Sequence, residues 1–156
     1  MKILSMPAGG LSRNYLFKDG VLNVVLNAYA YRPNGSTAAT VNGSVSIVSD
    51  KLRLSRAGGN SGCTAFITAP IDVTNVNGIQ FTIDSDNNLT YMYGCVTLVN
   101  ENNFTEVNNI TCTTPRAGTI WTVDTSALTG NYCFVIHVRN SNSNAGYVDI
   151  SEIVLI

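Results

Sequence analysis

The sequence predicts an all-β fold, an antiparallel β-sandwich of the jelly-roll type, from three observations. First, short runs of β-branched and aromatic residues alternate with turn clusters along the chain. Second, several of these runs alternate between apolar and polar residues, which is the pattern of a strand with one buried face. Third, no segment keeps a 3.6-residue apolar stripe over three helical turns. About eight or nine regularly spaced strands are typical of a sandwich or jelly roll.

The first residues are the least strand-like part of the chain. Residues 1–14 contain Pro7, Gly9 and Gly10, and we expect an irregular N-terminal arm there, ahead of one sandwich domain over residues 15–156. Two interpretations stay open: a docking arm that contacts a neighbouring subunit, or a frayed terminus. A docking arm would make its contacts through its apolar side chains, which are Met1, Leu4, Met6 and Leu11.

Residues 11–26 are the one weak helical candidate, and the Asp19-Gly20 pair lies in the middle of them. This dipeptide is a strong hairpin signal, because both residues reach positive φ at low cost. We therefore expect two strands joined by a tight turn.

Three further runs predict strands with one solvent-exposed face. In Ile79–Asp84 the odd positions are apolar and the even positions are polar. Gly43–Val48 and Lys51–Arg56 follow the same rule. The side chains that we expect to face inward from these two earlier runs are Val45, Ile47, Leu52 and Leu54.

Two later runs, Tyr91–Val99 and Cys133–Val138, are apolar on both faces. Such runs are central strands covered on both sides, or strands whose outer face meets a partner. The chain closes with a last strand region over residues 145–156.

Composition and charge exclude several classes of function. Charged residues are 12% of the chain and the net charge is −1, so we expect no basic surface and no nucleic-acid partner. The apolar runs are too short to span a bilayer, so we expect no membrane partner. The N-terminus lacks the apolar region of a signal peptide, which predicts synthesis in the cytoplasm.

The residues that carry nucleophilic chemistry do not form a convincing site. His137 is the only histidine, and Cys133, four residues before it on the same strand, would lie about 13 Å away. A Cys–His pair would need Cys63, Cys95 or Cys112 to approach from another strand. The spacing of the 10 acidic residues singles out no catalytic pair. We therefore expect no catalytic residue and no cofactor, and a hydrolase is the least favoured function.

Metal and disulfide chemistry are also disfavoured. The four cysteines show neither a CxxC pair nor a zinc-like Cys/His spacing, and a cytosolic origin favours buried thiols over disulfides. Asp84 and Asp86 offer oxygen ligands of the kind that Ca²⁺ takes, but the glycine and the distal glutamate of an EF-hand are missing. A polar hairpin tip is the favoured interpretation, and a calcium site is the weaker one.

Aromatic side chains are the remaining candidates for binding. Tyr29 and Tyr31 lie beside Arg32 and before the turn at Pro33, and Trp121 is the only tryptophan. Exposed rings stack on sugar rings or anchor protein contacts, whereas buried rings belong to the core. For the two tyrosines both interpretations stay open, and for Trp121 the core is favoured. The candidate ligand-binding residues are Tyr29, Tyr31, Arg32 and Trp121.

Four stretches of the chain together carry a family resemblance. They resemble an opening "Y-L-(Y/F)-x-x-G", an "I-D-(L/V)-T-x" before an apolar strand, an "x-x-x-D-(I/T)-S-x-L-x-G-x-Y" and a closing "V-x-I-S-x-I-x-L". The corresponding residues are Tyr15–Gly20, Pro70–Ile83, Trp121–Tyr132 and Val148–Leu155. Together they resemble small carbohydrate-binding-like β-sandwich domains in structural proteins of phages and prophages of Gram-positive bacteria. The usual Gly-Gly-Trp after the opening element is absent.

The same motifs have a physical role. The Asp-x-Thr at Asp72 and the Asp-x-Ser at Asp124 are expected to turn the chain by side-chain capping, and Gly130 to release it into the next strand.

The resemblance implies a non-enzymatic virion protein, made in the bacterial cytoplasm and displayed on the phage head or tail as a decoration or fibre-like protein. Its partners would be other virion proteins and further copies of itself. The alternative is a glycan-binding module that attaches the particle to the host cell surface. A large apolar side surface would favour the first function, and an exposed aromatic cleft would favour the second.

Overall fold

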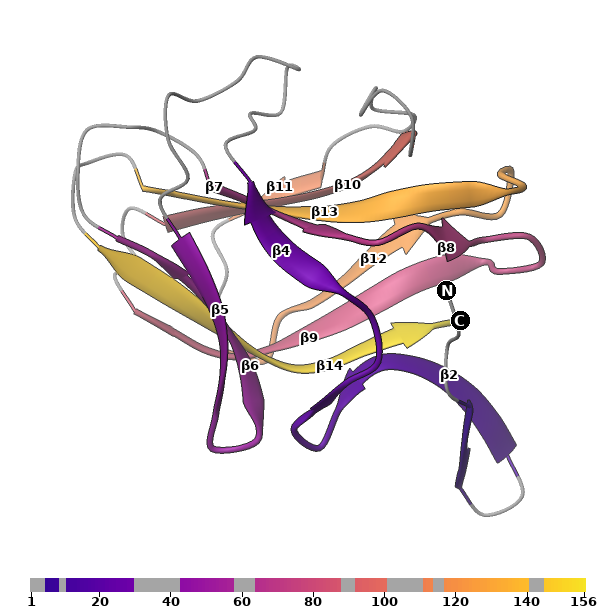
Figure 1. Ribbon diagram of the computed structural model, residues 1–156, viewed down its shortest axis with the longest axis horizontal. Helices are drawn as coiled ribbons and strands as arrows, with labels where there is room; N and C mark the ends of the chain where they lie inside the picture. Colours follow the sequence, from indigo (N-terminus) through magenta and orange to yellow (C-terminus); the bar gives the residue numbers. More distant parts are fainter. Residues whose placement is uncertain are drawn as a thin grey trace.

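The computed structural model describes residues 5–8, 11–29, 43–57, 64–87, 92–100, 111–113, 117–140 and 145–156. These residues form strands and turns, with no helix among them. The strands assemble into two antiparallel sheets that pack face to face (Figure 1). The predicted all-β sandwich of jelly-roll type is therefore confirmed.

Fourteen strands occur in the described residues. In chain order they are β1 (Ser5–Ala8), β2 (Leu11–Lys18), β3 (Val21–Leu22), β4 (Leu26–Tyr29), β5 (Gly43–Val48), β6 (Lys51–Arg56), β7 (Thr64–Thr68), β8 (Ile71–Asp72), β9 (Gly78–Asn87), β10 (Met92–Asn100), β11 (Thr111–Thr113), β12 (Ile120–Asp124), β13 (Asn131–Asn140) and β14 (Gly146–Leu155). This is more than the sequence predicts, because several strands are only two or three residues long.

The eight-stranded sheet is built around β14. Strand β9 pairs along one edge of β14, whereas β6 and then β2 pair along the other. Strand β5 extends the sheet beyond β6, β12 extends it beyond β9, and β1 and β3 both pair with β2. The closing segment of the chain is thus the centre of this sheet.

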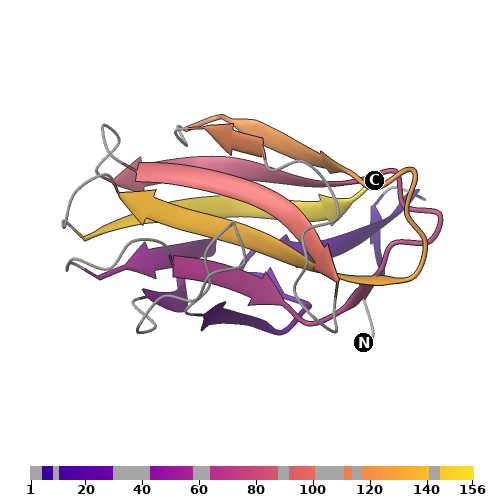
Figure 2. The same cartoon turned by 90° about the horizontal axis from the view of Figure 1, so that it is seen from above.

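The six-stranded sheet is built around β13. Strand β10 pairs along one edge of β13, and β7 and β8 pair along the other. Strands β11 and β4 form the two outer edges of this sheet. Seen from above, the strands of the two sheets run in roughly the same direction, as in an aligned sandwich (Figure 2).

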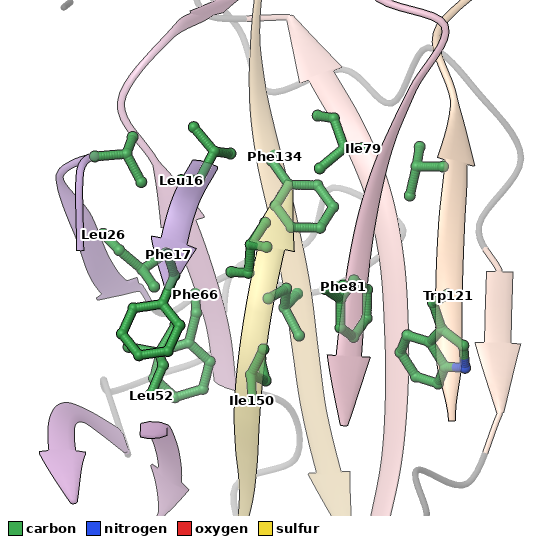
Figure 3. Close-up of a cluster of buried hydrophobic side chains, with 14 of the residues drawn as sticks. Leu16, Phe17, Leu26, Leu52, Phe66, Ile79, Phe81, Trp121, Phe134 and Ile150 are labelled. Atoms are coloured by element: carbon green, nitrogen blue, oxygen red, sulfur yellow. The ribbon is translucent and has the colours of Figure 1, made fainter. Parts of the chain in front are cut away.

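The main core lies between the sheets and follows the predicted alternation. The apolar residues of β9, which are Ile79, Phe81 and Ile83, are at most 1% exposed. Phe81 contacts Trp121 edge-on at a centroid distance of 4.9 Å and Phe134 of the other sheet at 5.9 Å (Figure 3). Burying one such side chain contributes about 1.5–3 kcal/mol, and Phe81 joins the two sheets.

The alternation rule is wrong at one position of the edge strand β5 and incomplete on its neighbour β6. Leu52 and Leu54 are fully buried and Val45 packs against the core, as predicted, but Ile47 is 45% exposed. Ile47 lies on β5, an edge strand whose hairpin with β6 projects from the sandwich, so the facing sheet does not cover it (Figure 1). The next inward position of β6 holds Arg56, which is 2% exposed and which its charge does not predict.

The N-terminal segment is more regular than expected. Strands β1 and β2 form a hairpin with a register from Ser5–Asn14 to Ala8–Leu11, because the two segments satisfy each other's backbone groups whatever their side chains. Met6 lies in β1 and Leu11 begins β2. Met1 and Leu4 lie outside the described residues.

The capping turns of the family-like motifs are confirmed. The Asp72 carboxylate accepts a hydrogen bond from the Thr74 N–H at 2.9 Å, and the Thr74 hydroxyl accepts one from the Gly130 N–H at 2.9 Å. The Asp124 carboxylate accepts hydrogen bonds from the Ser126 hydroxyl at 2.6 Å and from the Ser126 N–H at 2.9 Å. Hydrogen bonds from Thr74 lower the pKa of Asp72, and those from Ser126 lower the pKa of Asp124. Gly130 has the positive φ of 92° that a side chain would resist.

The predicted hairpin at Asp19-Gly20 is also confirmed. Asp19 and Gly20 have φ values of 49° and 77° and join β2 to β3. Ser49 and Asp50 adopt φ values of 49° and 60° and join β5 to β6. The two turns touch, because a Cβ atom on Gly20 would lie 2.9 Å from the Asp50 Oδ1 atom.

Candidate functional site

An open groove of about 720 Å³ lies between β4 and β5, the edge strands at one side of the two sheets. Figure 1 shows these strands at the same side of the sandwich. The lining consists of two short segments, one from each strand: Leu26, Asn27, Ala28, Tyr29, Gly43, Ser44 and Val45. The groove exists because each sheet ends there, and the two edges do not pair with each other as β-strands.

The groove combines an aromatic ring with hydrogen-bonding groups. Leu26 is buried and Ala28 packs against the core, so the alternate residues Asn27 and Tyr29 face outward. Tyr29 is 40% exposed. The Asn27 amide and the Ser44 hydroxyl are exposed and supply donors and acceptors. A ligand with an apolar face and hydroxyl-bearing edges matches this lining.

Of the three neighbouring candidates Tyr29, Tyr31 and Arg32, the structure places one at this groove. Tyr29, which the sequence left open between surface and core, lines the groove. Tyr31 and Arg32 lie outside the described residues, in the segment 30–42 that connects the two walls of the groove along the chain. The groove itself was not predictable, because no local pattern shows that residues 26–29 and 43–45 face each other.

Trp121 belongs to the core, which corrects its inclusion among the ligand-binding candidates. Its side chain is 6% exposed and meets the Phe81 ring edge-on. It lies in β12 of the eight-stranded sheet, at the opposite end of that sheet from β5. The alternation of Trp121 and Val123 with exposed Ile120 and Thr122 is therefore the signature of a half-buried edge strand.

The outer face of the six-stranded sheet carries a second apolar cluster. Phe134 and Ile136 of β13 face the main core, whereas Cys133 and Val135 join a separate buried group. The other members of this outer cluster are Ala65, Ile67 and Val99. The prediction of a central strand covered on both faces is confirmed for β13. Because Tyr29 is the register partner of Ala65, the groove adjoins this outer face.

A charged cluster on the eight-stranded sheet was not predicted. The Arg53 guanidinium donates two hydrogen bonds of 2.8 Å to the Asp149 carboxylate and lies 3.7 Å over the Tyr147 ring. The Ser85 hydroxyl donates a third bond of 3.1 Å to Asp149. The hydrogen bond with Asp149 raises the pKa of Arg53. These contacts hold β6, β9 and β14 together, which gives them a structural role.

The described residues offer no metal site or membrane span. The Asp84 carboxylate forms an ion pair with Lys51 at 3.3 Å, and the Asp86 side chain lies outside the described part. Among the described side chains, no group of three His, Cys, Asp or Glu could hold a metal ion. Within the same ranges there is no helix long and apolar enough to cross a bilayer.

The strand register brings His137 beside a cysteine. Cys95 of β10 is the backbone register partner of His137 on one side and of Cys112 in β11 on the other. Cys63 lies outside the described residues, and Cys133 is a buried thiol. The structure does not describe the side chains of His137 and Cys95, so the two residues are placed side by side by their backbone register alone.

The sequence matches no protein-family model and no curated protein. Solved structures with a similar fold include carbohydrate-binding modules. A family 11 module from Clostridium thermocellum, in complex with a β-1,3-1,4-mixed-linked tetrasaccharide, is similar with a TM-score of 0.54 and 18% identity over 92% of this chain and 95% of that one. The family 11 module of the cellulosomal cellulase Lic26A-Cel5E from the same organism is similar with a TM-score of 0.53 and 18% identity over 92% and 94%.

A family 29 carbohydrate-binding module has a TM-score of 0.51 and 12% identity over 94% of this chain and 92% of that one. At sequence identities this low, the structural similarity shows that the folds are alike. The chain thus has the β-sandwich fold of carbohydrate-binding modules.

Proposed function

We propose that this domain is a non-catalytic glycan-binding module and that the β4–β5 groove is its binding site. The observation that carries the proposal is the exposed Tyr29 ring, which lines the groove together with Asn27 and Ser44. An aromatic face packs against the apolar C–H face of a sugar ring, while amide and hydroxyl groups exchange hydrogen bonds with its hydroxyls. The carbohydrate-binding fold supports the same class of ligand.

The form of the groove favours a polysaccharide chain over a small molecule. Small-molecule sites are concave and bury most of their ligand, whereas this groove of about 720 Å³ is open to solvent between two sheet edges. An extended sugar chain can lie along such an open groove. The mixed-linked tetrasaccharide in the family 11 complex is a suitable first probe.

The lining also supports a binding role without catalysis. Glycoside hydrolysis needs a pair of carboxyl groups flanking the scissile bond. The described lining contains no carboxyl or imidazole group. The two acids with lowered pKa values, Asp72 and Asp124, are engaged in backbone turns.

Isothermal titration with the full-length chain tests the proposal. An array of bacterial cell-wall polysaccharides and β-glucans selects the ligand, and the mixed-linked tetrasaccharide is titrated in every case. We expect Tyr29→Ala to weaken binding about tenfold or more, which corresponds to roughly 1.4 kcal/mol. Tyr29→Phe keeps the ring and should bind within about threefold of the parent.

Ile120→Ala is the matched surface control, because Ile120 is 59% exposed on β12, away from the groove. This variant should bind like the parent. A parent chain that binds no glycan of the array would overturn the proposed function. A parent chain that binds while Tyr29→Ala binds equally well would place the site elsewhere.

We also propose a second function, the first one that the sequence motifs imply: the domain is displayed on a phage virion, where it contacts other virion proteins and further copies of itself. One structural feature favours a docking role. The β1–β2 hairpin extends beyond Asn14, at which the pairing of β2 with β14 ends. A hairpin that projects past its parent sheet can reach a neighbouring subunit.

A further inference from the structure

Cys95 and Cys112 are direct register partners across β10 and β11. These strands pair over three positions, Gly94 with Thr113, Cys95 with Cys112 and Val96 with Thr111. Strand β11 is the outer edge of the six-stranded sheet, at the opposite side from β4. Among the described strands, β10 is the partner that holds β11 in the sheet.

The register meets the distance condition for a disulfide. Directly opposite residues of an antiparallel pair have Cα atoms about 4.5 Å apart at non-hydrogen-bonded positions and about 5.5 Å apart at hydrogen-bonded ones. Disulfides join Cα atoms about 4.4–6.8 Å apart. Both kinds of position fall within that range. We propose that Cys95 and Cys112 are an oxidation site that forms a cross-strand disulfide when the protein meets a small-molecule disulfide.

The step is a thiol–disulfide exchange in two stages. The thiolate of one cysteine attacks a sulfur of the small disulfide, which forms a mixed disulfide and releases one small-molecule thiolate. The thiolate of the second cysteine then attacks the protein sulfur of that mixed disulfide and releases the other small-molecule thiolate. The two cysteine thiols lose two electrons and two protons in total, and the small disulfide is reduced to two thiols.

The disulfide would strengthen the attachment of the edge strand β11, which few backbone pairs hold to the sheet. Three register positions hold β11 to β10, and Cys112 is at the middle one. Oxidation would fasten this edge strand to the sheet that adjoins the groove. It would also close the chain between residues 95 and 112, which lowers the conformational entropy of the unfolded state.

Peptide mapping of the full-length chain tests the proposal. The reduced protein is incubated with excess oxidised glutathione, remaining thiols are alkylated, and non-reduced digests are analysed by mass spectrometry. We expect a cross-linked Cys95–Cys112 peptide as the dominant product, with the mass of two hydrogen atoms lost from the intact chain. The oxidised protein should melt roughly 5–10 °C above the reduced one.

Two variants separate this pair from the other thiols. Cys112→Ser should abolish the cross-link and leave glutathione attached at Cys95, and its melting temperature should not respond to the oxidant. Cys133→Ser, which alters a buried thiol outside the pair, should keep the cross-link. Three outcomes would overturn the proposal. The dominant disulfide could join Cys95 to Cys63 or Cys133, or all four thiols could stay reduced. The thiols could also bind a zinc ion that protects them from oxidation until it is chelated.

Discussion

At the residue scale, short polar side chains make the turns that connect the strands. Asp72 and Asp124 each accept a hydrogen bond from a backbone N–H two residues later, and this bond replaces a partner that a strand would have supplied. Thr74 extends the first turn to Gly130, more than fifty residues later in the chain. Short polar side chains thus supply hydrogen bonds that shape the turns.

The Asp124 turn predicts a dependence of stability on acid. Hydrogen bonds from Ser126 lower the pKa of Asp124 below its ordinary value of 3.8. The charged carboxylate therefore stabilises the fold above a pH of about 3.8, and this contribution is lost as the pH falls through the lower folded-state pKa. We expect the melting temperature to fall as the pH is lowered from 5 to 2, measured by circular dichroism.

Asp124→Asn isolates this effect, because asparagine keeps an acceptor oxygen but does not titrate. Its melting temperature should depend less steeply on pH than that of the parent. Ser126→Ala removes the hydroxyl hydrogen bond, which is the main cause of the lowered Asp124 pKa, and should give an intermediate slope. Equal slopes for the parent and Asp124→Asn would contradict the prediction.

At the element scale, the ends of the strands are held by specific hydrogen bonds. Thr125 follows β12 directly and is fully buried. Its hydroxyl donates to the Val76 carbonyl at 2.6 Å, and its N–H donates to the Asn77 carbonyl at 3.0 Å. The Asn77 N–H donates in turn to the carbonyl of Ile156 at 2.7 Å. The start of β9, the end of β12 and the end of β14 are thereby tied together.

Thr125→Val should destabilise the fold by about 1–3 kcal/mol, because it keeps the side-chain shape but leaves the Val76 carbonyl without its donor. Urea unfolding measures the change. The matched control is Thr122→Val on β12, where the exposed hydroxyl accepts a bond from Gln80 at 3.2 Å. That variant should stay within about 0.5 kcal/mol of the parent. Similar costs for the two variants would show that the buried bond has no special weight.

At the scale of the whole molecule, the two sheets share one core and the N-terminal hairpin lies at its margin. Phe81 of β9 contacts Phe134 of β13, so the central aromatic contact crosses the sandwich (Figure 3). The register of β2 with β14 starts at Asn14 and continues to Lys18. Residues 1–13 are therefore dispensable for the pairing that joins β2 to the sheet.

Removal of residues 1–13 tests the docking role of the hairpin. We expect the truncated chain to keep the β-sheet circular dichroism spectrum of the full chain, because the β2–β14 pairs and the core residues from Tyr15 onward are retained. In light scattering the full chain should have the mass of a defined oligomer and the truncated chain that of a monomer. Equal masses for both would contradict the docking arm, and an unfolded truncated chain would contradict its marginal place in the fold.

The sequence by itself determined the fold class, the main core and the turns, because these depend on neighbours along the chain. Alternation places Ile79, Phe81 and Ile83 on one face of a strand wherever that strand lies. Asp19-Gly20 and the Asp-x-Ser/Thr motifs act over two to four residues, so their turns follow from local chemistry. Tyr29 could be named as a binding candidate for the same reason, as an aromatic residue beside a turn.

The tertiary structure alone decided which segments meet. The groove joins residues of β4 and β5 through the ending of two different sheets. Arg53 and Asp149 form their ion pair across 96 residues, and Cys95 meets Cys112 through strand register. Ile47 departs from its expected place because burial depends on what the opposite sheet covers. The alternation of apolar and polar residues predicts which face of a strand is buried. It does not predict which strand lies beside it, because packing of the whole core selects the neighbouring strands.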